Sequence, residues 1–140
     1  MTRKRDELPC ALKFCSPAND KERNLLINEI GLMNQCRLKE AVVSVLASYE
    51  FKRKIWIFLE LMDEDVTALI DDYYQTYTET VVKYILKKVL EGLAHLHSLG
   101  IIHRDIKSDN VLVNRKGQIK LADFGYSVRL ANPVEDNRKS

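Results

Sequence analysis

The sequence predicts an α+β fold in two parts: a small sheet with one inserted helix, then a long helix and a short β-hairpin. Apolar residues recur at helical spacing in residues 21–35 and again in residues 79–98. The other apolar segments are short and β-rich, and Asp63-Glu64-Asp65 separates the two parts. A chain of 140 residues is long enough for one domain with a buried core.

The first part is predicted to open with a strand and a helix. Residues 8–14 are apolar apart from one lysine, which is typical of a strand. Ser16-Pro17 and Asn19-Asp20 supply turn and capping chemistry, so we expect a helix over residues 21–35. Gly31 inside this helix should cost about 1 kcal/mol relative to alanine. The apolar residues at helical spacing are Leu25, Leu26, Ile30 and Met33.

Two further strands complete the predicted sheet. Residues 41–49 and residues 54–62 are both β-rich, and residues 50–53 between them favour a hairpin. Asp63-Glu64-Asp65 breaks the second of these strands, so we expect it to be the connection between two lobes.

The second part is predicted to be a long helix followed by a hairpin. The helix covers residues 79–98, with Thr78 as the N-cap and Gly100 as the C-terminal stop. Residues 111–113 and 118–121 form two short strands joined by a turn of the kind hairpins use. One face of the helix carries Val82, Ile85, Leu86, Val89, Leu93 and Leu96.

Composition excludes several classes of function. The 22 basic and 20 acidic residues leave a formal charge of +2, so no overall field favours nucleic acid or a membrane surface. No apolar run approaches the roughly 18 residues that a membrane span requires. Cys10, Cys15 and Cys36 lack metal-ligand spacing and suit a reducing compartment. We expect a cytoplasmic protein, with the nucleus as the alternative, and neither a nucleic-acid partner nor a membrane span.

The strongest chemical signal is the segment His103-Arg104-Asp105-Ile106-Lys107-Ser108-Asp109-Asn110, between the long helix and the hairpin. A second segment, Asp123-Phe124-Gly125, directly follows the hairpin. Phosphoryl transfer needs a carboxylate that receives a hydroxyl proton and oxygen ligands that hold magnesium on the phosphates. A loop before a hairpin and a turn after it can place Asp105, Asn110 and Asp123 around one point.

These two segments resemble, residue for residue, the H-R-D-x-K-x-x-N loop and the D-F-G triplet of protein kinases. The resemblance implies a partial two-lobed protein-kinase fold that uses ATP and Mg²⁺. Asp105 would be the catalytic base, and Lys107 would neutralise the transferring phosphate. Asn110 and Asp123 would be the magnesium ligands, with Asn110 also part of the catalytic loop. A lysine at position 107 is similar to the pattern of the serine/threonine branch of kinases. The activity that the resemblance implies is therefore transfer of the γ-phosphate of ATP to a protein hydroxyl.

A lysine and a glutamate in the first part support the same interpretation. Cys10-Ala11-Leu12-Lys13 resembles the kinase V-A-I-K strand, whose lysine meets the α- and β-phosphates. Lys13 lies on an otherwise apolar strand, where a buried amine needs an anionic partner. Glu29 on the following helix is the candidate, because its helical spacing places it on the same side as Leu25 and Leu26. A solvent-exposed Glu29 is the alternative.

The resemblance also implies an adenine site. The strand before the connection resembles the kinase strand that leads into the hinge, with Leu59 at the gatekeeper position. Backbone groups of Glu60 and Met62 would then hydrogen-bond adenine, and Ala11 and Leu112 would enclose its ring. Core packing explains the apolar members of this set equally well.

The three histidines are interpreted as structural, His103 by the resemblance and the other two by their place on the long helix. His103, Phe124 and Met33 match the apolar stack that couples the two lobes of kinases. His95 and His97 lie on the long helix and are interpreted as structural, without a ligand role.

Within the kinases, Asn28-Glu29-Ile30, His97-Ser98 and residues 102–110 are most similar to the PAK-like branch of the sterile-20 group. We expect residues 1–62 to be the remainder of the N-lobe. Residues 63–140 would be the start of the C-lobe, as far as the beginning of the activation segment.

Three functions are compatible with these features. No G-x-G-x-x-G loop precedes Lys13 and no A-P-E triplet follows Gly125, so we expect a fragment without the phosphate lid and most of the second lobe. The chain would be part of an active kinase with a protein substrate. Alternatively, it is a truncated, inactive kinase-like module that acts by binding partners, such as an upstream kinase or a chaperone. A nucleic-acid binder through Arg3-Lys4-Arg5 is the weakest reading.

Overall fold

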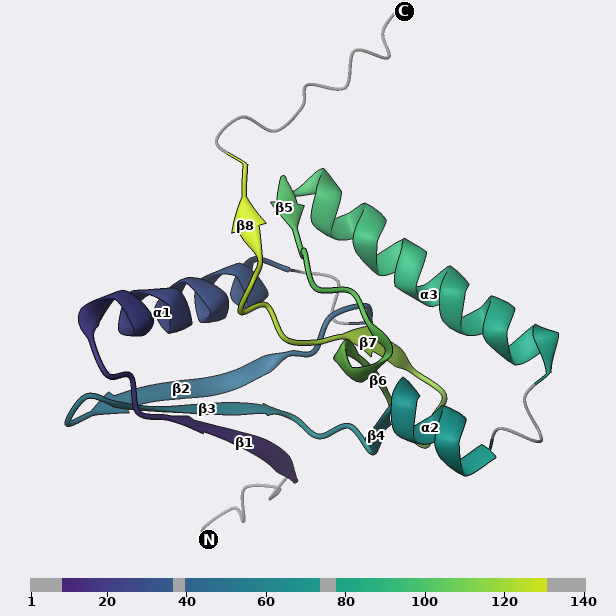
Figure 1. The fold of residues 1–140 in the computed structure, drawn as a ribbon, viewed down its shortest axis with the longest axis horizontal. Coiled ribbons are helices and arrows are strands. Elements are labelled where there is room, and N and C mark those ends of the chain that lie inside the picture. The colour runs from purple at the N-terminus through teal and green to yellow at the C-terminus, as the bar shows by residue number, and fades with distance from the viewer. Residues whose placement is uncertain (1–8, 37–39, 74–77, 131–140) are drawn as a thin grey trace, which may run out of the picture.

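The computed structural model describes residues 9–36, 40–73 and 78–130, and its first part is a sheet covered on one face by a helix (Figure 1). The sheet is antiparallel, in the order β1-β3-β2. The elements of this part are β1 (Cys10–Cys15), α1 (Asp20–Gln35), β2 (Val45–Phe51) and β3 (Lys54–Glu60). The predicted strand–helix–hairpin order is confirmed.

Helix α1 begins where the capping residues predict. The Asn19 side chain accepts a hydrogen bond of 2.9 Å from the backbone N–H of Glu22, which satisfies one of the free amides of the first turn. The buried residues of the helix are Glu29, Leu32 and Met33. Leu25 shares their face by helical spacing, but the residue is 53% exposed. That face of the helix is therefore buried near Glu29, Leu32 and Met33 and not at Leu25.

The prediction of a strand from Ala41 to Ser44 is wrong. Strand β2 begins at Val45, and the preceding residues run instead beside the second part of the molecule. The Val43 N–H donates to the Leu121 carbonyl at 3.0 Å, and the Leu121 N–H donates to the Ala41 carbonyl at 2.8 Å. The apolar character of this segment therefore reflects burial between the two parts.

Over its described residues, 64–73 and 78–130, the second part contains three helical segments and two small sheets. Its elements are β4 (Glu64–Asp65), α2 (Val66–Tyr73), α3 (Glu79–Ser98), β5 (Ile101–Ile102), a 3₁₀ turn (Ser108–Asn110), β6 (Val111–Val113), β7 (Ile119–Leu121) and β8 (Val128–Arg129). One sheet has the order β4-β6-β7, and the other pairs β5 with β8. The hairpin β6-β7 confirms the prediction, apart from Gln118.

The connection between the two parts is more structured than predicted. Glu64 and Asp65 form β4, which pairs with Val113 and Leu112 of β6. Helix α2, which the sequence does not predict, follows at once, and the Asp65 carboxylate accepts a hydrogen bond of 2.8 Å from the Ala68 N–H in its first turn. In the sequence, Asp63-Glu64-Asp65 is interpreted as the end of a strand, because neighbouring residues show neither the pairing of β4 with β6 nor the helix that Asp65 caps.

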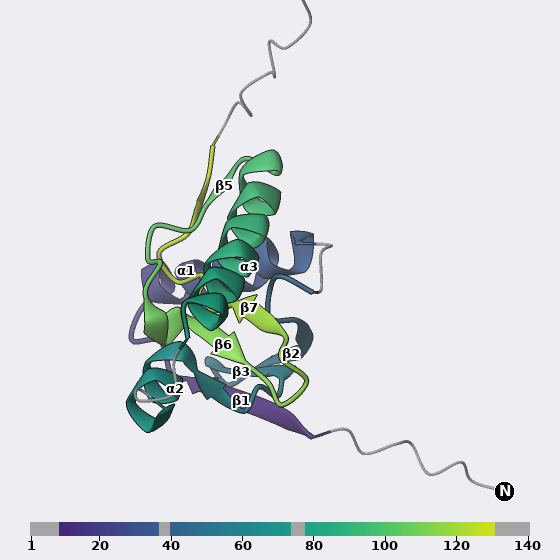
Figure 2. The same ribbon diagram turned by 90° about the vertical axis from the view of Figure 1, so that its right-hand side faces the viewer.

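Helix α3 has the predicted bounds and lies alongside the hairpin (Figures 1 and 2). Thr78 caps its start, and Gly100 follows its end with a φ of 70°, a conformation that favours glycine. Val89 and Leu96 are buried, but Val82 and Leu86 of the same predicted face are exposed. The apolar stripe is therefore covered by the described residues over only part of its length.

One apolar core joins the two parts. It includes residues from α1, the segment before β2, α3 and the hairpin, with Leu96, Ile101 and Phe124 fully buried. None of the helices in the described ranges is both long enough and apolar enough to span a membrane.

Candidate active site

The catalytic-loop candidates are held together by Asn110. Its side-chain N–H₂ donates to the backbone carbonyl and to Oδ2 of Asp105, both at 2.9 Å. The Lys107 ammonium lies 3.5 Å from the same Oδ2 atom. Asn110 is buried, whereas Asp105 and Lys107 retain access to solvent. The loop therefore fixes the orientation of the Asp105 carboxylate and leaves it open to a substrate.

The loop is tied to the segment Asp123-Phe124-Gly125 through the backbone. The Ala122 N–H donates to the Asn110 carbonyl at 2.9 Å, which brings Asp123 beside the loop. Asp123 has a φ of 59° and accepts a hydrogen bond of 3.2 Å from the Gly125 N–H. The predicted meeting of the loop and the triplet at the end of the hairpin is seen in these contacts.

His103 supports the loop as a buried, neutral imidazole. Its ring lies 4.9 Å from the ring of Phe124, edge to face, as the predicted apolar stack requires. Burial lowers the pKa of His103, although the hydrogen bond to the Ala122 carbonyl and the charges of Asp123 and Asp105 oppose this. Nε2 lies 3.0 Å from that carbonyl, and Nδ1 lies 3.3 Å from the Asp105 N–H. These two partners require Nε2 to carry the proton and Nδ1 to accept.

The lysine of β1 and the glutamate of α1 form an ion pair. The Lys13 ammonium donates to Glu29 Oε1 at 2.7 Å. The expectation of a buried amine is wrong in one respect, because the Lys13 side chain is 37% exposed while that of Glu29 is 6% exposed. Partial burial lowers the pKa of Lys13, but the hydrogen bond and charge of Glu29, with the charge of Asp123, outweigh it and raise the pKa overall. The ammonium therefore stays charged, on a side chain that is only partly buried.

The pair also adjoins the Asp123 triplet. A β-carbon placed on Gly125 would lie 3.2 Å from Asp123 Oδ1 and 4.0 Å from Glu29 Oε2. The tight contact is the one with Asp123, and the distance to Glu29 shows that the triplet lies beside the carboxylate of α1. The three charged groups from β1, α1 and the triplet meet at one place.

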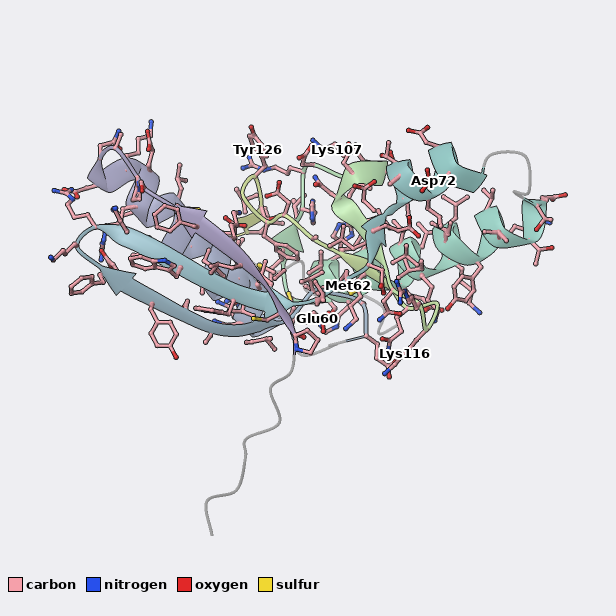
Figure 3. All side chains as sticks on the ribbon, turned by 90° about the horizontal axis from the view of Figure 1, so that it is seen from below. Glu60, Met62, Asp72, Lys107, Lys116 and Tyr126 are labelled. Atoms are coloured by element: carbon pink, nitrogen blue, oxygen red, sulfur yellow. The ribbon has the colours of Figure 1, made fainter. Side chains whose placement is uncertain are left out.

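A cavity of about 300 Å³ lies between the β1-β3-β2 sheet and the hairpin. Its lining contains the predicted adenine residues, the Lys13–Glu29 pair and Asp123, so it has apolar walls and one charged end. Figure 3 shows Glu60 and Met62 close together where the sheet meets the second part, with Lys107 and Tyr126 at the opposite edge of that region. The lining residues are Ala11, Lys13, Glu29, Ile30, Met33, Val43, Ile57, Leu59, Glu60, Met62, Leu112, Ala122 and Asp123.

Asp105, Lys107 and Asn110 do not line this cavity. They adjoin it through Ala122, which belongs to the lining and bonds to Asn110. The arrangement is a pocket with a charged end, and a loop carrying a carboxylate just outside that end. Such an arrangement can bind a ligand whose apolar part lies between the cavity walls and whose anionic part lies at the charged end, near the Asp105 carboxylate.

The donor set of the described residues fits magnesium better than a transition metal. They contain no cluster of three or more His, Cys, Asp or Glu side chains that could hold a metal. Asn110 uses its N–H₂ group on Asp105, and its side-chain carbonyl has no partner in the described part of the chain. Together with the Asp123 carboxylate it offers two oxygen ligands, and magnesium is commonly held by one or two such groups plus phosphate oxygens.

Comparison with known proteins agrees with this geometry. The protein kinase domain family matches residues 1–139. The chain belongs to the protein kinase family. Its relatives include the serine/threonine-protein kinases pakA and pakB of Dictyostelium discoideum, at 40% identity over 86% of this chain and 36% over 81%. Serine/threonine-protein kinase STE20 of Yarrowia lipolytica is 37% identical over 88% of the chain.

The chain spans 10%, 14% and 11% of the lengths of these three kinases. The predicted family, its serine/threonine class and the similarity to the PAK and STE20 kinases are confirmed. The α+β class and the partial kinase fold are confirmed with them. The roles of individual residues remain predictions.

Some residues of this kinase site are not predicted by the sequence. Val43, Ile57 and Ala122 line the cavity, and the sequence assigns none of these three a role in the site. Ile57 could have been found, because it alternates with Leu59 along β3 and pairs with Lys13 across the sheet. Val43 could not, since its position depends on the contact with Leu121.

Proposed function

We propose that this chain forms the nucleotide-binding and phosphoryl-transfer centre of a serine/threonine protein kinase that uses ATP and magnesium. The observation that carries the proposal is the link made by Asn110, which holds Asp105 by its side chain and Ala122, beside Asp123, by its backbone. That link sets a candidate base next to the charged end of a cavity suited to a nucleotide.

Each wall of the cavity has a role in this proposal. Ala11 and Leu112 enclose the adenine ring, and backbone groups of Glu60 and Met62 bind its polar edge. Lys13, oriented by Glu29, binds the α- and β-phosphates. The cavity volume of about 300 Å³ is at the lower end of the range typical of small-molecule sites.

The chemical step uses the loop outside the cavity. The substrate hydroxyl oxygen attacks the γ-phosphorus, the bond from that phosphorus to the β–γ bridging oxygen breaks, and ADP leaves. Asp105 accepts the hydroxyl proton, and Lys107 faces the charge on the transferring group. Asn110 and Asp123 hold magnesium, which when bound neutralises charge on the phosphates. The substrate is a protein serine or threonine.

The cellular setting is part of the proposal. The three cysteines are free thiols, which supports action in a reducing compartment, the cytoplasm or the nucleus.

One observation favours a second candidate, a kinase-like module that acts by binding a partner protein such as another kinase or a chaperone. Helix α3 exposes Val82, Leu86 and Leu90, so an apolar strip is available for a partner. This candidate does not require nucleotide, and therefore predicts no magnesium-dependent binding of ATP.

The two candidates are separated by incubating the chain with magnesium, ATP labelled on its γ-phosphate, and dephosphorylated casein. If the chain is a kinase, casein should gain labelled phosphoserine or phosphothreonine, and it should gain no label when EDTA removes magnesium. The melting temperature of the chain should also rise with magnesium-ATP. The absence of both transfer and a thermal shift would leave the binding module as the better account.

A further inference from the structure

A buried lysine, Lys120, joins the hairpin to the end of β3. Lys120 is the central residue of β7, and its side chain is 7% exposed. Its ammonium lies 2.6 Å from Oε1 of Glu60, the last residue of β3, whose side chain is 24% exposed. This oxygen is buried and has no aligned hydrogen bond in the described residues, so the ion pair is its compensation.

The register of the hairpin places this pair beside the cavity. Lys120 pairs directly with Leu112 across β6-β7, so the two side chains lie on the same face of the hairpin. Leu112 lines the cavity, and so does Glu60 at the other end of the ion pair. The ion pair therefore connects the hairpin side of the cavity, at Leu112, to the end of β3. The segment from Glu60 to Met62, which lines the cavity at that end, is called the rim.

The same rim is tied down at two further points. The Glu60 N–H donates to the Ser44 carbonyl at 3.0 Å, and the Asp63 N–H donates to the Val113 carbonyl at 3.0 Å. Met62 lies between these bonds and contributes to the rim. The backbone N–H and C=O groups of the rim cannot be re-aimed by a change of side-chain rotamer. Their position therefore depends on the contacts that hold this segment.

We infer that Lys120 is a positioning residue: its ion pair with Glu60 holds the backbone from Glu60 to Met62 against the hairpin and thereby sets the affinity of the site for adenine nucleotides. The inference rests on the proposed function, in which that backbone binds adenine. Lys120 touches neither the phosphates nor the substrate hydroxyl in this account. Its loss should weaken nucleotide binding and spare the chemical step.

The test compares Lys120→Met with the wild-type chain, with Lys120→Arg as the conservative rescue and Lys116→Met as the matched control. Lys116 is an exposed lysine in the turn of the same hairpin, and Figure 3 shows it projecting from the molecule. Hydrogen–deuterium exchange is measured at the amides of residues 60–63 and of α1. The dissociation constant for magnesium-ATP and the transfer rate at saturating ATP are measured on the same samples.

In Lys120→Met, the amides of residues 60–63 should exchange about tenfold faster, while those of α1 are unchanged. The dissociation constant should rise about tenfold, with the saturated rate within about twofold of wild type. Lys120→Arg should restore both properties, and Lys116→Met should change neither.

Unchanged exchange at residues 60–63 would overturn the inference, as would equally accelerated exchange throughout the chain. If Lys120→Met does not fold, Glu60→Gln breaks the same pair from the more exposed side, and the same results decide. A wild-type chain that binds no nucleotide would refute the proposed function, whereas the exchange at residues 60–63 would still show whether the pair holds the rim.

Discussion

At the residue scale, the two lysines that interrupt apolar strands carry the same signal. Lys13 pairs with Glu29 at 2.7 Å, and Lys120 pairs with Glu60 at 2.6 Å. A lysine among apolar strand residues indicates a nearby carboxylate, because an unpaired buried ammonium is costly. For Lys13 this rule predicts the pair with Glu29. The same rule applies to Lys120, which belongs to none of the kinase motifs and for which those motifs predict no partner.

His103 predicts a dependence of stability on pH. Its pKa in the fold lies below the ordinary value of 6.5 because of burial. The unfolded chain therefore binds more protons than the folded chain once the pH falls below about 6.5. The His103 contribution to stability is present above that pH and is lost as the pH falls through the folded pKa. We expect the free energy of unfolding, measured by urea titration, to decrease from pH 7 towards pH 5.

His103→Phe tests the origin of this acid sensitivity. Phenylalanine keeps a ring against Phe124 but loses the hydrogen bond to Ala122, which should cost about 1 kcal/mol at pH 7. Its stability should then depend less on pH between 7 and 5 than that of the wild type. His97→Asn, a change at an exposed position of α3, should keep the wild-type dependence. The same slope in His103→Phe and wild type would show that another group is responsible.

At the element scale, the segments with local signals are predictable and those that depend on distant partners are not. Helices α1 and α3 each begin at a residue whose side chain caps the first turn, and their apolar residues recur at helical spacing. Both features can be recognised from residues that are close together in the sequence. Strands β5 and β8 contain two residues each and exist because they pair with each other. Strand β4 likewise depends on β6. No local pattern distinguishes such short strands from loop.

Two helical glycines predict opposite effects of the same substitution. A β-carbon added to Gly31 would meet nothing within 4 Å beyond its chain neighbours and the backbone of α1 itself, so Gly31→Ala should stabilise the chain by about 0.5–1 kcal/mol. In α3, a β-carbon on Gly92 would lie 3.0 Å from Leu121 Cδ1 and 3.4 Å from the Ala41 carbonyl oxygen. Because Leu121 is buried in the core, we expect the β-carbon to be poorly accommodated, so Gly92→Ala should destabilise the chain by about 1 kcal/mol net.

Urea unfolding of both variants beside the wild type measures these effects. Each variant serves as the control for the other, because both gain helix propensity and only one meets a neighbour. Stabilisation by Gly92→Ala as large as that by Gly31→Ala would contradict the close packing of α3 on β7.

At the scale of the whole molecule, the site lies where the two parts meet. Residues 41–44, for which the sequence predicts a strand, instead bond to β7 and bring the cavity walls together. The sequence motifs identify the charged end of the cavity because kinase chemistry restricts those residues strongly. They cannot identify how the parts are joined, since that depends on backbone bonds between segments far apart in the chain.

Asp105, held by Asn110, is the base that we propose for phosphoryl transfer at this site. The most direct test is the turnover rate of Asp105→Asn at saturating magnesium-ATP, with nucleotide affinity measured on the same preparation and Asp109→Asn, an exposed change in the same loop, as the control. We expect a loss of about 10²–10⁴-fold in the rate for Asp105→Asn, unchanged nucleotide affinity, and a normal rate for Asp109→Asn. Turnover by Asp105→Asn at the wild-type rate would contradict the claim.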